Sequence, residues 1–202
     1  MDVITILGTA LGAAWTSGIN LYATVAVLGL LQRFGFVGRL PGGLEVLDNW
    51  WIIGVALFLY AVEFFADKIP YVDTVWDAVH TFIRVPAGAC LALAATTDLD
   101  PSIQVIALLV GGTLALSTHG TKATVRAGAN LSPEPFTNWT LSVVEDVFAV
   151  GAVILAVLHP VVVLVLILIF LLVLAWVLPK VVRRLRKMVG AVRDFFRRKA
   201  TA

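Results

Sequence analysis

The stretch "VDTVWDAVHTFIRVPAGACLAL", residues 72–93, joins a polar helix face to a membrane-like apolar sequence. Asp73, Asp77, His80 and Arg84 follow one another at intervals of four, three and four residues, which places them in one stripe along a helix. The residues after Arg84 are almost wholly apolar, as in a helix that crosses a bilayer. The stretch therefore predicts a membrane helix whose four ionisable side chains need partners or water.

The whole chain has the composition of an integral membrane protein. Its 202 residues are 60% hydrophobic and 14% charged, with a mean hydropathy of +0.96, whereas soluble domains are about 25% charged. The single cysteine, Cys90, excludes an intrachain disulfide and a cysteine-based metal cluster. Because a membrane span needs about 20 residues, we expect an all-α protein with about six spans, which are the apolar runs at about 3–35, 50–66, 79–97, 103–118, 141–158 and 160–178.

Two of these runs carry a matching interruption. The first run is too long for one straight crossing and contains Ser17, Gly18 and Asn20, while the fourth run is followed by His119 and Gly120. We therefore expect spans 1 and 4 to be broken helices, with these residues at the breaks. Helix ends exposed by a break inside a membrane are typical of ion and substrate sites in transporters.

The two halves of the chain share a further pattern. Asn49-Trp50 opens the second run and Asn138-Trp139 precedes the fifth run. Tryptophan at a membrane interface is common, so this alone does not prove a repeat. We nevertheless predict two inverted three-helix repeats, about 3–97 and 103–178, within a transmembrane bundle of residues 1–179.

The C-terminal segment, residues 180–202, is strongly basic. It holds nine Lys and Arg residues, which places it on the cytoplasmic side. We expect an amphipathic helix on the anionic lipids of the inner leaflet, or more simply a topological anchor. Six spans would then put the N-terminus in the cytoplasm too, although Arg33 and Arg39, on the outer side, count against this. The expected location is the bacterial inner membrane, with several passes.

Four polar stripes are expected to meet in the cytoplasmic half of the bundle. A charge that faces lipid near the bilayer centre costs at least about 2.5–3.5 kcal/mol, so the stripes should face one another or water. Arg84 cannot lose its proton and needs a carboxylate, with Asp77, Asp146 and Glu63 as candidates, although the pair could serve only to fix the helices. The expected substrate- or ion-binding residues are Glu63, Asp67, Asp77, His80, Arg84, His119, Lys122, Arg126, Glu145 and Asp146.

The charges near these helix ends favour a cation or a proton over an anion. Six acids (Glu63, Asp67, Asp73, Asp77, Glu145, Asp146) face four bases (Lys68, Arg84, Lys122, Arg126), which leaves a formal charge of −2. The oxygen and nitrogen atoms of Glu63, Asp77, His80 and Asp146 would suit a divalent metal ion, although His80 could equally be a packing residue. No cofactor is certain.

Four segments carry a resemblance to a known family. They are "WTSGINLYATVAVLGLLQRFG" (15–35), "EFFADKIPYVDTVWDAVHTFIRVPAGA" (63–89), "HGTKATVRAGANLSPEPFTNW" (119–139) and "VEDVFAV" (144–150). Over about residues 8–155 the chain resembles an uncharacterised family of bacterial inner-membrane proteins known only as a domain of unknown function (number 4126). The resemblance implies a protein with several membrane spans.

A shorter motif, "EFFADK" at residues 63–68, is similar to the E-x-G-D-K motif of small cation/proton exchangers. Those exchangers are also built from inverted three-helix repeats, but this sequence has one extra residue and lacks the glycine. The proline- and glycine-broken segments also resemble carriers of polyprenyl phosphate lipids, for which Arg84, Lys122 and Arg126 would be phosphate partners.

The sequence thus favours a small proton-coupled secondary transporter over an enzyme, with a divalent cation as first substrate. Alternatives are a carrier of an anionic lipid or small anion, an intramembrane enzyme that acts on lipid head groups, and a membrane scaffold. Against an enzyme, the chain has neither G-x-S-x-G nor H-E-x-x-H. The expected partners are the bilayer, anionic inner-leaflet lipids at the tail and a second copy in a homodimer, with no nucleic acid.

Overall fold

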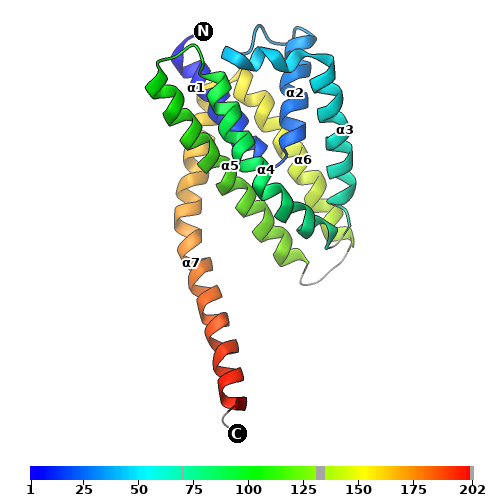
Figure 1. Cartoon of the computed structure of the whole chain (residues 1–202), viewed down its shortest axis with the longest axis vertical. Coiled ribbons are helices and arrows are strands. Elements are labelled where there is room, and N and C mark those ends of the chain that lie inside the picture. The colour runs from blue at the N-terminus through cyan, green and yellow to red at the C-terminus, as the bar shows by residue number, and fades with distance from the viewer. Residues whose placement is uncertain (70, 131–134, 201–202) are drawn as a thin grey trace. The chain divides into compact units, whose positions relative to one another are not determined.

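The computed structural model describes residues 1–69, 71–130 and 135–200, which are helical and contain no strand. The helices, shown in Figure 1, are α1 (Val3–Ser17), α2 (Leu21–Arg33), the 3₁₀ helix η1 (Gly42–Asp48), α3 (Trp50–Ala66), α4 (Val72–Ala95), α5 (Pro101–Ala129), α6 (Pro135–Leu158) and α7 (Pro160–Ala200). The chain divides into two compact units, Met1–Leu164 and Val165–Ala202. The expectation of an all-α membrane protein is confirmed at this level.

Within the residues that the structure describes, four helices, or five if a bent pair counts as one span, are long and apolar enough to cross a membrane. By length and composition α4, α5, α6 and the Pro160–Arg184 part of α7 qualify, and α3 qualifies together with η1, which is bent 77° against it. Helices α1 and α2, with 15 and 13 residues, are each shorter than a span. The expected six spans are therefore not confirmed.

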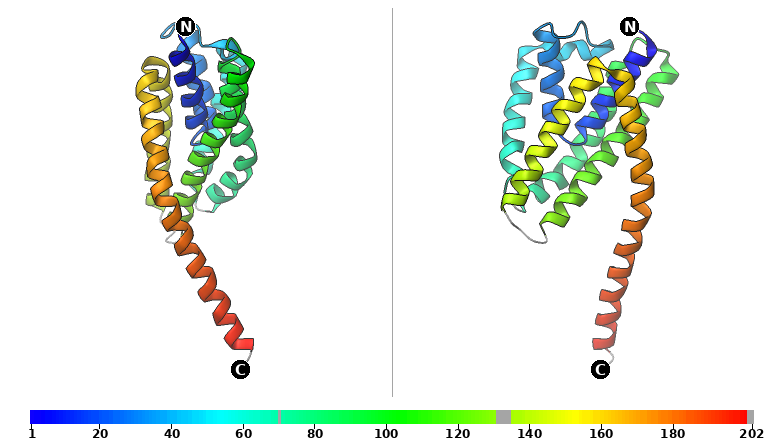
Figure 2. Two further views of the ribbon diagram at one scale, coloured as in Figure 1. Left: turned by 90° about the vertical axis from the view of Figure 1, so that its left-hand side faces the viewer. Right: turned by 180° about the vertical axis from the view of Figure 1, so that it is seen from behind.

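Helices α1 and α2 form a helical hairpin. Both outer ends lie at the same end of the bundle, because Met1 and Ile6 line one cleft together with Gly38–Gly42 and Leu99. The break between the helices, residues 18–20, lies deep in the bundle, where Asn20 caps α2 by accepting a hydrogen bond from the Ala23 amide at 2.9 Å. Figures 1 and 2 show α1 descending into the bundle and α2 returning. The expected break at Ser17, Gly18 and Asn20 is thus present, but the broken helix turns back.

The second expected break is absent. Helix α5 runs without interruption from Pro101 to Ala129, and a Cβ atom on Gly120 would meet no atom within 4 Å. The position is therefore an exposed glycine within a continuous helix. The two asparagines of the repeat pattern also differ, since Asn49 caps α3 whereas Asn138 lies inside α6. The inverted-repeat arrangement is not confirmed.

Small residues allow α1, α4 and α5 to approach closely. A Cβ atom on Gly88 would clash with Ala115, and one on Gly111 would clash with Ala92. In a membrane, where lipid is as apolar as the helices, such close packing replaces the hydrophobic effect as the main attraction. Many large apolar side chains point outward, and Trp51 and Phe82 are 84% and 83% exposed. The bundle is therefore tightly packed inside and apolar outside.

Exposed carboxylates cap the N-termini of α1 and α5. Asp2 accepts a hydrogen bond from the amide of Thr5 and Asp100 accepts one from the amide of Ser102. These bonds favour the charged carboxylate, so the pKa of both groups lies below the usual value.

The side chains of Leu185 and residues 188–200 lie outside the described residues, so the expected apolar face of the tail stays a prediction.

Candidate functional site

A group of buried charges occupies the end of the bundle opposite η1, where α3 ends, α4 begins, α5 ends and α6 begins. We call it the charged cluster, and it consists of Glu63, Asp67, Asp73, Asp77, Arg84, Lys122, Arg126 and Glu145. Its side chains are 0–4% exposed except that of Glu145, which is 14% exposed. The four expected polar stripes therefore do converge.

Arg84 lies at the inner end of the cluster. Its Nη2 atom donates to Glu63 Oε1 at 2.5 Å, and its Nη1 atom lies 3.5 Å from Asp77 Oδ1. Both Arg84 and Glu63 side chains are 0% exposed. Of the three carboxylates expected for Arg84, Glu63 makes the shortest contact, Asp77 a longer one, and Asp146 pairs elsewhere.

Lys122 lies among several carboxylates. Its Nζ atom is 3.0 Å from Asp67 Oδ2, 3.3 Å from Glu63 Oε1 and 3.6 Å from Glu145 Oε2. Arg126, one turn later on α5, donates to Asp67 Oδ2 at 3.0 Å and to both oxygens of Glu145. Each of these bases therefore shares its charge among two or more acids.

The outer edge of the cluster is amide-rich. The Asn130 amide donates to both oxygens of Asp73 at 2.9 and 3.0 Å, and the Asn138 amide donates to Asn130 Oδ1 at 3.1 Å. Arg126 Nη1 lies 3.6 Å from Asp73 Oδ2. Asn130 was not among the expected site residues, although it lies one turn after Arg126 on the same stripe and could have been found that way.

The tip of the α1–α2 hairpin, residues 18–20, reaches the cluster through its backbone. Arg84 Nη1 donates to the Gly18 carbonyl at 3.4 Å, and Lys122 Nζ donates to the Ile19 carbonyl at 3.2 Å. A Cβ atom on Gly18 would overlap the Thr118 hydroxyl and the Ala115 carbonyl, so only glycine allows this approach. Sequence reasoning found the break but could not assign these carbonyls, because they carry no side-chain signal.

Asp146 lies against the tip rather than in the cluster. Its Oδ1 atom accepts a hydrogen bond from the Asn20 amide at 2.9 Å, and its Oδ2 atom is buried with no hydrogen-bond partner. Within the described residues Asp146 has no Lys, Arg or His nitrogen within 4.0 Å. It is therefore a buried carboxyl group that accepts a hydrogen bond from an amide and interacts with the Tyr60 hydroxyl.

His119 connects α4 and α5 inside the cluster. Arg84 Nη1 donates to His119 Nδ1 at 3.0 Å, and a guanidinium can only donate. The His119 Nε2 atom lies 3.0 Å from the Asp77 carbonyl, which can only accept. The ring is therefore the neutral tautomer with its proton on Nε2.

His80 faces away from the cluster. Its ring stacks on Trp76 with centroids 4.3 Å apart, Nδ1 donates to the Trp76 carbonyl at 2.8 Å, and Nε2 lies 3.1 Å from the Tyr22 hydroxyl. Sequence reasoning placed His80 with Asp77 and Arg84 but did not find Tyr22, which comes from α2. The contacts fit the packing role left open for His80.

The expected divalent metal site does not form. In the part of the chain that the structure describes, no three His, Cys, Asp or Glu side chains are arranged to hold a metal ion. Glu63 and Asp77 face Arg84, whereas His80 bonds Tyr22 and Asp146 bonds Asn20. Helix packing turns these four side chains toward different neighbours in the described structure, and the metal assignment stays a prediction that this geometry does not support.

Lys68 also differs from the other bases. Its Nζ atom donates to the Phe64 carbonyl at 3.0 Å and to the Ser142 hydroxyl at 3.3 Å, and it lies over the Phe64 ring. It therefore does not belong to the cluster, which is left with five acids and three bases.

Comparison with known proteins gives one match. A family model described as a domain of unknown function (DUF4126) matches residues 7–180. No curated protein and no solved structure matches.

Proposed function

The chain belongs to the domain of unknown function family DUF4126, and we propose that it is a small proton-coupled secondary transporter of cations. The observation that carries this proposal is an acid-rich cluster of buried charges at the tip of the α1–α2 hairpin. Transporters commonly hold their ions at such breaks, where half-helix ends meet near the bilayer midplane.

The charge balance of the cluster supports a site for protons or cations. Five acids against three bases leave two negative charges when every group is ionised. Uncompensated charge at membrane depth is costly. Binding of protons or of a cation removes that cost, so the cluster should exchange one for the other.

Unsatisfied carboxylate oxygens support the same proposal. Glu63 Oε2, Asp67 Oδ1, Asp77 Oδ2 and Asp146 Oδ2 are buried without a hydrogen-bond partner. A protonated carboxyl group gains a donor and loses its charge, which makes its burial cheaper. Asp146, which has no Lys, Arg or His nitrogen within 4.0 Å among the described residues, is our first candidate for the transported proton.

The hairpin tip offers a means of coupling. Arg84 and Lys122 hold the carbonyls of Gly18 and Ile19, and the same two bases are held by the acids of the cluster. Protonation of an acid in the cluster would weaken its ion pair with Arg84 or Lys122, so that base could bind the carbonyls of the tip more tightly. A bound cation would instead repel the base. A change of charge could thus bias the position of the hairpin.

The substrate is proposed as a small cation, without a resident metal site. The divalent ion first expected loses support because the four chosen ligands face different neighbours. An anionic head group or small anion is disfavoured, because Lys122 and Arg126 are already paired with acids. The enzyme and scaffold alternatives gain no specific support from the geometry.

We also propose an orientation for the chain. With the α1–α2 hairpin re-entrant, five crossings would place the N-terminus outside when the basic tail is cytoplasmic. The charged cluster would then open to the cytoplasm, as first expected, and Arg33 and Arg39 would lie outside with the N-terminus. Accessibility of a cysteine added next to Met1, in a Cys90→Ser background, would test this against the earlier assignment of a cytoplasmic N-terminus.

The proposal is tested by proton flux in proteoliposomes that contain a pH-sensitive dye. Monovalent cations, divalent cations and small anions are added in turn to wild type and to Asp146→Asn, Asp77→Asn and Glu63→Gln. We expect one class of cation to drive proton movement, and the three variants to lose it while still inserting as folded monodisperse protein.

Glu45→Gln is the matched control, because Glu45 is an exposed acid whose pair with Arg39 is 3.7 Å long. Its flux should equal that of wild type. Deletion of residues 181–202 should also leave the proton flux of a transporter intact. A scaffold that recruits partners through this basic tail would lose that recruitment. Flux that persists in all three cluster and tip variants, or silence with every cation, would refute the transporter assignment.

A further inference from the structure

The oxygen atoms around Lys122 form a complete set of acceptors for one ammonium group. A lysine ammonium has three N–H donors. The Lys122 Nζ atom donates to Asp67 Oδ2 at 3.0 Å, to the Ile19 carbonyl at 3.2 Å and to Glu63 Oε1 at 3.3 Å. The side chain is 2% exposed. Helix α3 and the hairpin tip thus build a buried cage of oxygen atoms that fits a –NH₃⁺ group.

The carboxylates of this cage have capacity for a second cation. Glu63 Oε2, Asp67 Oδ1 and Asp77 Oδ2 are buried without a hydrogen-bond partner. The other oxygen of each of these three carboxylates lies within 3.8 Å of Lys122 Nζ. The cluster also carries two negative charges in excess when every group is ionised, because it holds five acids and three bases. Spare acceptors and spare negative charge therefore occur together beside Lys122.

The geometry of the cage favours a cation that donates hydrogen bonds over a divalent metal ion. Ca²⁺ binds oxygen at about 2.3–2.6 Å and Mg²⁺ at about 2.0–2.1 Å, whereas the nearest carboxylate oxygen lies 3.0 Å from Lys122 Nζ. No three His, Cys, Asp or Glu side chains in the described ranges are arranged to hold a metal ion. Carboxylate and carbonyl oxygens only accept hydrogen bonds, so a cation with N–H donors satisfies them directly.

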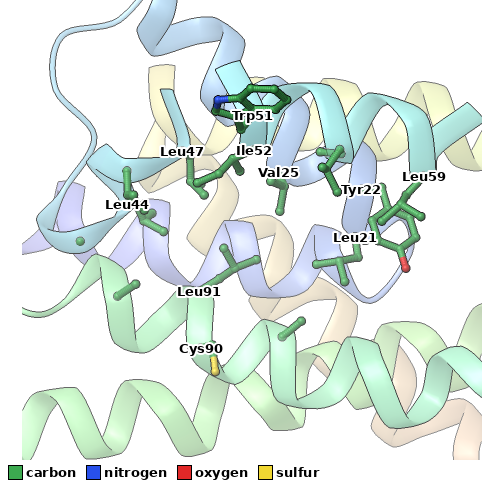
Figure 3. Close-up of a pocket in the computed structure, with 16 residues that line it drawn as sticks. Leu21, Tyr22, Val25, Leu44, Leu47, Trp51, Ile52, Leu59, Cys90 and Leu91 are labelled. Atoms are coloured by element: carbon green, nitrogen blue, oxygen red, sulfur yellow. The ribbon is translucent and has the colours of Figure 1, made fainter. Parts of the chain in front are cut away.

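The apolar groove between α2, η1, α3 and α4 offers no comparable site for a cation. Figure 3 shows the side chains that line it, among them Leu44, Ile52 and Leu91, and none of these described lining residues is charged. A cation in the groove would lose its water without gaining a counter-charge. The charged cluster is therefore the place where a cation can be held.

We propose that the transported cation is an ammonium ion or a small protonated primary amine, bound by the carboxylates that hold Lys122. This inference rests on the transport function proposed above and names the substrate class of that site. Lys122 presents the same –NH₃⁺ group to the same oxygens, so it competes with the substrate. One bound ammonium changes the formal charge of the cluster from −2 to −1, so the cluster attracts it without becoming positive.

Glu145 provides the approach to the cage. Its side chain is 14% exposed, and its Oε2 atom lies 3.6 Å from Lys122 Nζ. The other acids of the cluster are at most 4% exposed. A cation that enters from this end of the bundle therefore meets the Glu145 carboxylate before it reaches Glu63 and Asp67.

Binding of chloride salts to full-length protein in mild detergent tests the substrate class. The melting temperature at neutral pH is followed during titration with ammonium, methylammonium, potassium, sodium, magnesium, calcium or tetramethylammonium. Ammonium and methylammonium should raise it saturably, because a ligand of the folded state stabilises that state. Tetramethylammonium has the charge but no N–H donor, so it should act only through ionic strength, as should the metal ions. Detergent is used because neutral ammonia crosses bilayers by itself and would disturb a pH dye.

Three variants test the competition by Lys122. Lys122→Met removes the competitor and should tighten ammonium binding by about tenfold, the effect of one charge-assisted hydrogen bond. Lys122→Arg keeps a positive charge in the cage and adds donors, so it should weaken ammonium binding even if Lys122→Met does not fold. Lys68→Met is the matched control, because Lys68 is a buried lysine that donates to Phe64 and Ser142 instead of to the cluster. Its ammonium affinity should equal that of wild type.

The outcomes separate this inference from the transport function. Equal stabilisation by potassium or tetramethylammonium, or equal ammonium affinity in wild type and the folded Lys122 variants, would overturn the ammonium site. Proton flux driven by metal cations without ammonium binding would also overturn it but keep the transporter. Saturable ammonium binding without cation-driven flux would support the site and refute transport. Absence of both binding and flux with every cation would refute both.

Discussion

Replacement of Glu63 by Gln should be among the most destabilising single changes in the bundle. Glu63 Oε1 accepts from Arg84 at 2.5 Å and from Lys122 at 3.3 Å, and the Glu63 and Arg84 side chains are 0% exposed. Without this carboxylate Lys122 keeps Asp67 at 3.0 Å, but among the carboxylates of the cluster Arg84 keeps only Asp77, at the longer distance of 3.5 Å. The penalty therefore falls on Arg84.

Loss of one partner from a buried ion pair costs about 3–5 kcal/mol, because the other charge stays buried without compensation. For a chain of this size, such a change lowers the melting temperature by roughly 6–20 °C. The assay is thermal unfolding in mild detergent, followed by size-exclusion fluorescence. Glu45→Gln removes a solvent-exposed pair with Arg39 and should cost less than about 1 kcal/mol.

A double variant tests whether the loss of stability comes from a buried charge without a partner. Glu63→Met with Arg84→Met removes both partners and leaves neither charge uncompensated, so it should be more stable than either single variant. If Glu63→Gln melts within the range of Glu45→Gln, or if the double variant merely adds the two single costs, the reasoning from the buried pair is refuted.

Three further predictions concern the tip, His119 and a helix cap. Gly18→Ala should lower both thermal stability and flux because its Cβ would overlap Thr118 and Ala115, whereas Gly120→Ala, with no atom within 4 Å, should be neutral or stabilising by up to about 1 kcal/mol; equal melting temperatures would contradict this. Nitrogen NMR should find His119 neutral with its proton on Nε2, and His119→Leu should cost about 1–3 kcal/mol because Arg84 Nη1 loses its 3.0 Å acceptor and keeps only the longer contacts with Gly18 and Asp77, with His119→Gln less damaging; a proton on Nδ1 would exclude the assigned contacts. The pKa of Asp100 in the folded protein lies below its usual value, so the cap stabilises α5 at pH values above the unfolded pKa, and this stabilisation is lost as pH falls through the folded pKa. The difference in melting temperature between wild type and Asp100→Ala should therefore shrink as pH falls over that interval. A difference that stays constant with pH would argue against the cap.

The sequence by itself determined that charged faces of α3, α4, α5 and α6 meet, and it predicted most of the residues of the cluster. The helical spacing of Asp73, Asp77 and Arg84, and of Lys122 and Arg126, puts each set on one face. Because charges cannot face lipid, these faces had to turn toward one another. That argument uses only composition and periodicity, which explains why it succeeds without a structure.

Only the tertiary structure decided the partners and the path of the chain. Gly18 and Gly120 read alike in sequence, yet one lies at the tip of a hairpin packed against Thr118 and Ala115 and the other faces open space. His80 and Asp146 share helix faces with cluster residues but bond Tyr22 and Asn20, which the returning α2 helix brings to them. A break in a helix frees backbone groups without fixing the direction of the next helix, so close packing and buried hydrogen bonds settle that direction.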